Sequence, residues 1–259
     1  MPDTRQLGPL ERWRSYLVLN PLVYLYTFVL GTLSLLSSLL DRSGRVQHWF
    51  ARTWSWLILK TAMCPLRVEG VENLDLRRAA IYACNHQSAL DIPALYVGLD
   101  FQFRIMAKKE LFRYPFMGWH LKRSGQIPIE RENARSSLKS LIRASEAVRG
   151  GTPLLVFPEG GRTPDGTIKP FLGGAFYVAI KGGVPIVPMA LVGTYEALPM
   201  NSYVIRPHSM RLIIGNPIST EGMNPRDMDT LAAKVQKAIE ELYYPNAFVA
   251  DPRSEKTTA

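Results

Sequence analysis

The longest apolar feature of the chain is an uncharged run of 26 residues, from 15 to 40, near its amino terminus. As a helix rising about 1.5 Å per residue, this run is longer than the ~30 Å hydrocarbon core of a bilayer. It exceeds the apolar part of a usual cleavable signal peptide, and its carboxyl end lacks a small-x-small cleavage site. The run therefore predicts a segment that contacts a membrane.

A second helical stretch follows the uncharged run, with apolar side chains on one face and polar ones on the other. Arg45, His48 and Arg52 lie on the expected polar face. The apolar face carries Val46, Trp49, Phe50, Trp54 and Leu57. Tryptophan on such a face favours a helix lying in the membrane interface. An amphipathic helix packed on a globular domain is the alternative interpretation.

The charges around the uncharged run bear on how it meets the membrane. A single span with the main domain in the cytoplasm would leave the preceding arginines outside, against the positive-inside tendency. Asn20-Pro21 and Gly31 are natural points for a helix to break. We therefore expect a re-entrant or in-plane pair of helices, with the main domain on the cytoplasmic side of the membrane (the inner membrane if the protein is bacterial).

Beyond residue 65 the pattern changes to short apolar runs that alternate with amphipathic helices. Runs that are apolar throughout indicate strands covered on both faces. The expected strands are 66–71, 79–84, 103–107, 126–130, 153–157, 186–192 and 210–214. Helical spacing of apolar residues recurs over 138–148 and 231–242. The fold class predicted is α/β, a mixed, largely parallel sheet flanked by helices and preceded by the membrane-associating helical segment. The expected division is 1–62, 63–250 and a flexible tail, 251–259.

Composition and charge narrow the class of protein. At 259 residues with 47% hydrophobic residues, the chain can bury one substantial core. Its formal charge of +9 favours an acidic partner, either nucleic acid, an anionic bilayer, a phosphorylated substrate or an acidic carrier protein. The sequence shows no cluster of basic residues with stacking aromatic residues, which argues against a nucleic-acid-binding protein. Cys64 and Cys84, the two cysteines, are expected to be buried free thiols in a reducing compartment.

A histidine and an aspartate lie directly after the expected strand 79–84. The segment reads Asn85-His86-Gln87-Ser88-Ala89-Leu90-Asp91. Side chains at the carboxyl end of a sheet strand face a crevice, where the imidazole of His86 can take a proton near neutral pH. Asp91 can hold the imidazole tautomer and stabilise the imidazolium. The alternative is structural, because Ser88 and Asp91 also match a capping box at the start of a helix.

Other kinds of catalysis fit the sequence less well. Ser88 lies too close to His86 to act as a triad nucleophile, and the chain has no Gly-x-Ser-x-Gly elbow. The four histidines lack the close spacing of zinc ligands, so no metal site is expected. A lipid hydrolase would share the histidine and the membrane segment, and it remains a rival hypothesis.

A second candidate site follows the expected strand 153–157. It reads Phe157-Pro158-Glu159-Gly160-Gly161-Arg162-Thr163, with Lys169 shortly after. Glycines let backbone amides approach a ligand, and an arginine can bind phosphate oxygens. The motif predicts a phosphate pocket. In the alternative interpretation it is an ordinary turn in which Glu159 and Arg162 pair with each other.

Together these segments resemble the four blocks of the glycerolipid acyltransferases, in particular the 1-acyl-sn-glycerol-3-phosphate acyltransferases. The blocks begin at Asn85, Gly125, Phe157 and Val187, in the family's order, with Lys108-x-Glu110-Leu111 and Pro115-x-x-Gly118 between them. The resemblance covers residues 66–218. It implies that His86 is the base and Asp91 its partner. It also implies that the substrate site is lined by Asn85, Ser88, Lys108, Arg131, Glu159, Gly160, Arg162 and Thr163.

The chain departs from the family pattern in the second and third blocks. Pro128 stands where an aromatic residue is common, and Glu130 where aspartate or asparagine is usual. These two departures leave open how the expected strand 126–130 pairs and which acceptor is selected. Gly161 replaces a usual threonine, which removes one possible phosphate ligand.

The resemblance implies acyl transfer from acyl-CoA or acyl-carrier protein to the 2-hydroxyl of 1-acyl-sn-glycerol 3-phosphate. No cofactor is expected beyond the thioester co-substrate, and no covalent acyl-enzyme is expected. The expected partners are a phospholipid membrane, the lysophospholipid and the acyl donor. Glycerol 3-phosphate, another lysophospholipid or a lyso-ornithine lipid are alternative acceptors.

Overall fold

The seven expected strands form one sheet in the computed structural model, which describes residues 8–41, 43–130, 133–249 and 251. The strand order is β1-β7-β6-β2-β5-β3-β4. Only the β6–β7 pair is antiparallel among the described pairs. The strands are β1 Leu66–Glu69, β2 Ile81–Cys84, β3 Arg104–Lys108, β4 Ile127–Ile129, β5 Leu154–Val156, β6 Ile186–Val192 and β7 Met210–Ile214. The predicted largely parallel α/β fold is confirmed.

Burial follows the position of each strand in the sheet. Every residue of the central strands β2 and β6 is buried, as their uninterrupted apolar sequences predict. At one edge lies β4, which pairs in parallel with β3 so that Pro128 stands opposite Ala107. Proline is tolerated on an edge strand, because a missing N–H there removes no ladder hydrogen bond. The unusual Pro128 therefore leaves strand pairing intact. Cys64 and Cys84 are buried free thiols, as expected.

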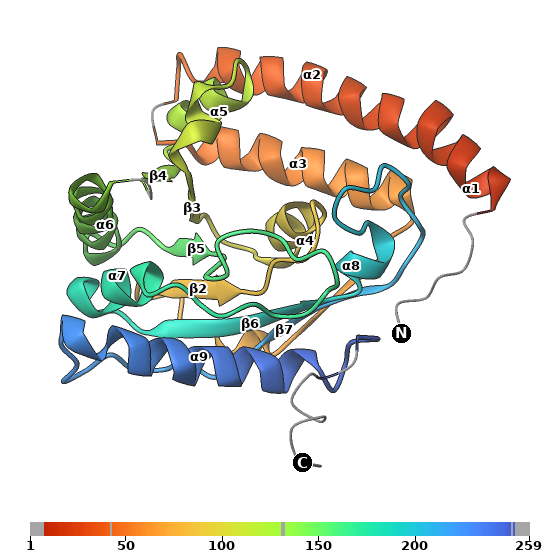
Figure 1. Cartoon of the computed structure of the whole chain (residues 1–259). Helices are drawn as coiled ribbons and strands as arrows, with labels where there is room; N and C mark the ends of the chain where they lie inside the picture. Colours follow the sequence, from red (N-terminus) through yellow and green to blue (C-terminus); the bar gives the residue numbers. More distant parts are fainter. Residues whose placement is uncertain (1–7, 42, 131–132, 250, 252–259) are drawn as a thin grey trace.

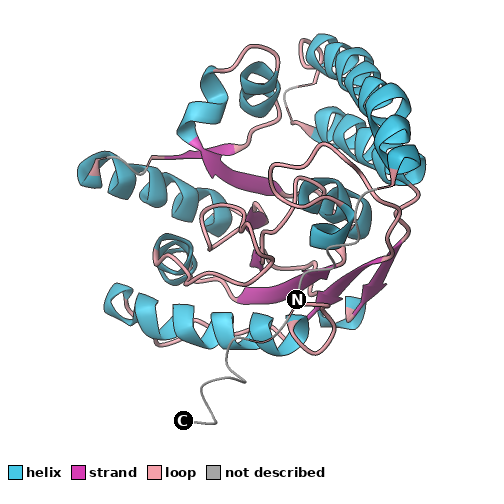
Figure 2. Ribbon diagram, turned by 45° about the vertical axis from the view of Figure 1, so that its right-hand side comes forward, coloured by secondary structure: helices cyan, strands magenta, loops and turns pink. Residues whose placement is uncertain are grey.

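Helices cover both faces of the sheet (Figure 2). One core lies between the sheet and α6, α7 and α9. The other lies between the sheet and α3 and α4, with α2 outside α3 (Figure 1). The helices are α1 Pro9–Arg14, α2 Asn20–Ser37, α3 Arg45–Ala62, α4 Asp91–Gly98, α5 Met117–Arg123, α6 Ala134–Arg149, α7 Gly174–Gly182, α8 Thr194–Ala197 and α9 Met228–Tyr243. The expected helices around 138–148 and 231–242 are α6 and α9.

The amino-terminal segment is one helix, Pro9–Ser37, without the predicted breaks at Asn20-Pro21 and Gly31. A π-helical turn, Ser15–Leu19, joins α1 to α2, and Asn20 N–H donates to the carbonyl of Ser15. This wider turn accommodates Pro21, whose ring would otherwise clash with the carbonyl four residues earlier. In the described part of the chain, this is the single helix long and apolar enough to cross a bilayer. The uncharged run is therefore a single helix, and the prediction that it forms a pair of helices is wrong.

The expected polar face of α3 is wrong at one position. His48 is buried, and its ring lies 5.1 Å from the rings of both Tyr96 and Phe103. Burial and nearby arginines lower its pKa to about 4, so the ring is neutral at physiological pH and suits an apolar site. On another face, Trp54 donates to Thr27 of α2. The helix therefore packs between α2 and the sheet domain, as the alternative interpretation of this stretch held.

The described residues up to position 62 are tied closely to the sheet domain. Ile58, Leu59 and Ala62 of α3 belong to the same core as β2 and α4. Further out, Arg14 and Ser15 hydrogen-bond to the backbone of Ile205. A boundary at residue 62 therefore does not separate two independent cores, and removing α3 would expose apolar surface. The expected flexible tail falls almost entirely outside the described residues.

Candidate active site

The two sequence motifs meet because their strands are neighbours. β2 and β5 pair in parallel, with Ile81 opposite Leu154 and Ala83 opposite Val156. The segments that follow them, 85–91 and 157–163, therefore leave the sheet at the same edge. A direct hydrogen bond joins them, since His86 N–H donates to Glu159 Oε1 over 2.6 Å. Residues more than seventy positions apart thus share one site.

His86 and Asp91 form a hydrogen-bonded pair. The His86 Nδ1 and Asp91 Oδ2 atoms lie 2.7 Å apart, and the Asp91 side chain is fully buried. A carboxylate at Nδ1 fixes the tautomer in which Nδ1 carries the hydrogen and Nε2 has a free lone pair. Among the described residues, Nε2 has no hydrogen-bond partner. The imidazole, 17% exposed, can therefore take a proton from a bound molecule.

Asp91 also serves the helix that it begins. Its Oδ2 accepts hydrogen bonds from Gln87 N–H at 2.8 Å and Ser88 N–H at 2.9 Å. Ser88 Oγ in turn accepts from Leu90 N–H at 3.1 Å. The predicted capping box is formed only in part, because the Ser88 hydroxyl accepts from Leu90 N–H and not from Asp91 N–H. One carboxylate oxygen therefore orients both this partial cap and the imidazole, so the structural and the catalytic interpretations of Asp91 are compatible. Its charge remains available to stabilise an imidazolium.

The ring of Phe157 forms one wall of the site. It stacks on His86, with ring centroids 4.0 Å apart and an interplanar angle of 18°. This contact and the Asp91 hydrogen bond together limit rotation of the imidazole. The sequence placed Phe157 at the end of an apolar strand. No local pattern indicates that its ring stacks on His86, which is distant in the sequence. The role of Phe157 could not be predicted.

Glu159 links the histidine loop to the loop after β5. While Oε1 accepts from His86 N–H, Oε2 accepts from Lys169 N–H at 3.0 Å. Burial raises the pKa of Glu159 to about 8, and the two backbone hydrogen bonds oppose that shift. Each carboxyl oxygen of Glu159 is thus occupied by a backbone N–H group. Glu159 therefore does not pair with Arg162, and that alternative interpretation of the motif is wrong.

The loop after β5 carries an arginine, Arg162. Lys169 Nζ binds the carbonyl oxygens of Gly161 and Arg162, which fixes the backbone of the loop. Gly160 has a φ of 75°, a left-handed conformation that favours glycine. Among the described residues, no group forms a hydrogen bond or ion pair with the Arg162 guanidinium. A half-buried cation without a partner, beside the His86 loop, is suited to bind an anionic ligand.

Comparison with known proteins identifies the family. The acyltransferase family profile matches residues 65–192. A 1-acyl-sn-glycerol-3-phosphate acyltransferase of Pseudomonas aeruginosa is 31% identical over 83% of this chain and 84% of its own length. The chain belongs to the acyltransferase family.

Further relatives and one solved structure are similar to this acyltransferase. A chloroplastic 1-acyl-sn-glycerol-3-phosphate acyltransferase of Brassica napus is 37% identical over 70% of this chain. The match covers 53% of that protein, and the chain spans about half the length of this and other plant relatives. The crystal structure of the 1-acyl-sn-glycerophosphate acyltransferase PlsC of Thermotoga maritima superposes with a TM-score of 0.74 at 26% identity. That match covers 90% of this chain and 97% of the other.

Two of the expected substrate contacts are engaged in hydrogen bonds within the fold. Asn85 is fully buried, and its amide group donates to Leu191 O at 2.9 Å and accepts from Leu191 N–H at 2.7 Å. Ser88 is fully buried too, and its hydroxyl donates to Leu198 O at 2.8 Å. Both side chains attach the histidine loop to β6 and the segment after it. Their hydrogen bonds are used within the fold, so we assign them a positioning role.

Other expected contacts lie farther from His86 or outside the described residues. Lys108 ends β3, which is separated from β2 by β5, and its exposed ammonium lies 3.6 Å from Glu110. Thr163 is fully buried, and its hydroxyl has no hydrogen-bond partner in the described part of the chain. Arg131 lies outside the described residues. In those that are described, no group of three histidine, cysteine or acidic side chains could hold a metal ion.

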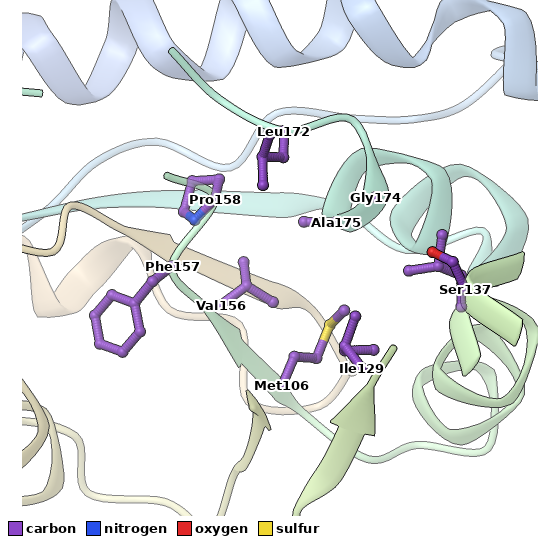
Figure 3. A pocket seen from close by; sticks show the side chains of 10 residues that line it. Met106, Ile129, Ser137, Val156, Phe157, Pro158, Leu172, Gly174 and Ala175 are labelled. Atoms are coloured by element: carbon purple, nitrogen blue, oxygen red, sulfur yellow. The ribbon is translucent and has the colours of Figure 1, made fainter. Parts of the chain in front are cut away.

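A largely apolar cavity of about 340 Å³ lies behind the Phe157-Pro158 backbone (Figure 3). It is enclosed by β3, β4, β5, α6 and α7, and the Phe157 ring points away from its other lining side chains. The lining residues are Met106, Ile129, Ser137, Leu141, Val156, Phe157, Pro158, Leu172, Gly174 and Ala175. This lining offers few hydrogen-bonding groups, so an apolar chain suits it.

Proposed function

We propose that this acyltransferase moves a fatty-acyl group from an acyl thioester to the 2-hydroxyl of 1-acyl-sn-glycerol 3-phosphate, which gives phosphatidic acid. The observation that carries the proposal is the His86–Asp91 pair, 2.7 Å apart, in a site whose second loop carries Arg162, a cation without a partner in the described part of the chain. Relatives at 31–37% identity are named as 1-acyl-sn-glycerol-3-phosphate acyltransferases, which supports this acceptor.

In the proposed reaction His86 is a general base and then a general acid. Its Nε2 takes the proton of the acceptor hydroxyl while the hydroxyl oxygen bonds to the thioester carbonyl carbon. The tetrahedral intermediate collapses as the carbon–sulfur bond breaks, and the imidazolium returns its proton to the leaving thiolate. Asp91 stays ionised and stabilises the imidazolium throughout. No acyl-enzyme forms, and Ser88 is engaged with Leu198 O.

The donors that stabilise the oxyanion are proposed to come from the loop after β5. The N–H groups of His86, Gln87 and Ser88 all donate to carboxylate oxygens within the site. They are therefore unavailable to an oxyanion. The backbone of Gly161-Arg162 lies in the loop that follows β5, the strand next to β2, and Lys169 holds it in place. It is the better source of such donors.

The substrates divide between lipid and water. The helix Pro9–Ser37 is long, apolar and mostly exposed, which supports a membrane-associated enzyme that receives its single-chain acceptor from a leaflet. The net charge of +9 favours an anionic acceptor, an anionic surface, or an acidic acyl-carrier donor. The apolar cavity near Phe157 is proposed to take the acyl chain of the donor. We propose that the sheet domain lies on the cytoplasmic side of the membrane, where the thioester donors are made.

The test is thiol release by the purified full-length chain. With acyl-CoA or acyl-carrier protein as donor, release should require lysophosphatidate and should match the phosphatidic acid formed. His86→Ala is the control for background hydrolysis. Equal release with and without acceptor would identify a hydrolase instead. A panel with glycerol 3-phosphate, other lysophospholipids and a lyso-ornithine lipid would show whether a different acceptor is preferred.

A further inference from the structure

A group of exposed apolar side chains lies on the segment between β3 and β4, within the sheet domain. We call it the α5 tip, and it consists of Tyr114, Phe116, Met117 and Trp119. Their relative exposures are 57%, 48%, 45% and 53%. Four large apolar residues exposed within six positions form a patch that a soluble surface seldom carries without a partner. Nothing in the proposed chemistry uses them.

The backbone at the α5 tip adopts a sparsely populated conformation. Phe116 has φ 59° and ψ −66°, and Met117 N–H donates to Pro115 O over 2.6 Å. These values describe a γ-turn of the rare kind, which places an L residue in a strained conformation. Gly118 follows, where an added Cβ would lie 2.4 Å from Phe112 O, so the turn is also packed tightly against the preceding segment. The turn therefore fixes the backbone that carries the exposed Phe116 side chain.

The α5 tip continues the exposed apolar face of the amino-terminal helix. The ring of Phe116 lies 6.3 Å from that of Phe28 on α2 and 5.6 Å from that of Trp119. Ser34 Oγ and His120 Nδ1, 3.1 Å apart, also join α2 to α5. Figure 1 shows α5 beside the end of α2, at the same side of the molecule. The exposed apolar residues of α2 include Tyr24, Leu25, Phe28, Val29, Leu33 and Leu36.

Cations lie next to the α5 tip on both sides in sequence. Arg113 precedes it, and Lys122 and Arg123 follow it on the last turn of α5, all three exposed. Aromatic side chains flanked by lysine and arginine match the boundary between acyl chains and anionic headgroups. This combination favours a lipid surface over a second protein, which would bury the apolar group without requiring the cations.

We propose that the α5 tip inserts into an anionic lipid leaflet beside α2, so that the sheet domain contacts the membrane through its own residues. This proposal rests on the membrane association in the proposed function. The strands β2, β5 and β3 are parallel, so their carboxyl ends lie on the same side of the sheet. The segment that contains α5 follows β3 on this side. Insertion of the α5 tip therefore holds the carboxyl ends of these strands near the lipid surface. A lipid acceptor would then reach His86 without leaving the leaflet.

The first test compares binding of the full-length chain to vesicles of phosphatidylcholine mixed with phosphatidylglycerol. The double substitution Phe116→Ser and Trp119→Ser should weaken binding about tenfold or more, which corresponds to ~1.4 kcal/mol. Leu76→Ser is the matched control, because Leu76 is 59% exposed in the loop before β2, at the opposite edge of the sheet. It should bind as the unchanged protein does. Lys122→Gln with Arg123→Gln should reduce the salt-sensitive part of binding.

A second variant tests the proposal even if the double variant does not fold. Tyr114→Cys, labelled with an environment-sensitive bimane dye, should show a blue shift on addition of vesicles. The native cysteines are buried, and a dye at Leu76→Cys should show no shift. An unshifted spectrum at position 114, or vesicle binding of the double variant within about threefold of the unchanged protein, would overturn the proposal. So would a dimer that the double variant dissociates while vesicle binding is unchanged.

Activity separates this proposal from the proposed function. All variants of the α5 tip should keep acyl transfer to lysophosphatidate dispersed in detergent and should lose transfer to vesicle-bound substrate. If the unchanged protein transfers no acyl group in detergent, the proposed function fails whatever the vesicles show. If it does transfer and the α5 tip variants match it on vesicles, the function stands and the membrane contact of the α5 tip is wrong.

Discussion

Replacing Asp91 by asparagine removes the charge beside His86 while it keeps the size of the side chain and one acceptor oxygen. In the structure Asp91 Oδ2 accepts from His86 Nδ1, Gln87 N–H and Ser88 N–H. An asparagine oxygen in the same place can accept all three. Its amide would occupy the position of Oδ1, which has no hydrogen-bond partner among the described residues. The helix cap should therefore persist, and stability should fall by no more than about 1 kcal/mol.

The effect on catalysis should be much larger. Two unit charges 4 Å apart interact by about 4 kcal/mol at an effective dielectric constant of 20. A charge-assisted hydrogen bond contributes about 1.5–3 kcal/mol, and the two figures describe overlapping parts of one interaction. A loss of about 3–4 kcal/mol at the transition state, where His86 is protonated, lowers kcat by about 10²–10³-fold. His86→Ala should abolish acyl transfer, and its residual rate is the lower limit against which the rate of Asp91→Asn is compared.

The assay is steady-state thiol release with lysophosphatidate in detergent, with thermal unfolding of each variant as the measure of stability. Asp91→Ala is the matched comparison, since it removes the charge and the cap together and should lower both kcat and Tm. The reasoning would be refuted if Asp91→Asn kept more than about a tenth of kcat with an unchanged Tm. Asp91 would then serve only to cap α4.

Three further variants test other parts of the site. In the unchanged protein, kcat/KM should rise with pH as Glu159, whose pKa is about 8, ionises. Folding stability should fall between about pH 4.5 and 8, because in this range the Glu159 carboxyl is ionised in the unfolded chain but still protonated in the folded one. Glu159→Gln should flatten the rise in a rate profile. Arg162→Ala should raise KM for lysophosphatidate by about 10–100-fold, because it removes charge-assisted hydrogen bonds of ~1.5–3 kcal/mol, and a change confined to the donor's KM would contradict the phosphate assignment. Ala175→Leu should fill the cavity and shift competition assays toward shorter acyl donors, whereas an unchanged chain preference would place the acyl chain elsewhere.

Some features of the site followed from residue types and their order along the chain. Apolar runs bounded by turns predicted seven strands, because a strand buried on both faces must be apolar along its whole length. His86 and Asp91 were predicted as a pair, because a histidine after a buried strand and an acid one helical turn later can meet within a single loop. Their contact is local, so local sequence sufficed.

Contacts between distant segments were not predictable in the same way. Glu159 was expected to bind substrate, but the structure places it between His86 N–H and Lys169 N–H, which requires β2 and β5 to be neighbours. Asn85 was expected at the substrate, and it instead binds the backbone of Leu191 on β6. Strand order is decided by the packing of whole helices against the sheet, and a single strand's sequence carries no record of its neighbour.

The amino-terminal segment shows the same division. Its length and lack of charge were sufficient to predict a helix that suits a membrane, because hydrocarbon thickness fixes the number of residues needed. Whether Pro21 would break that helix depended on the π-helical turn before it. Whether His48 would face solvent depended on Tyr96 of α4 and on Phe103, whose rings pack against it. Periodicity defines which residues share a face, but only the tertiary structure decides what lies against that face, because burial is a property of the assembled fold.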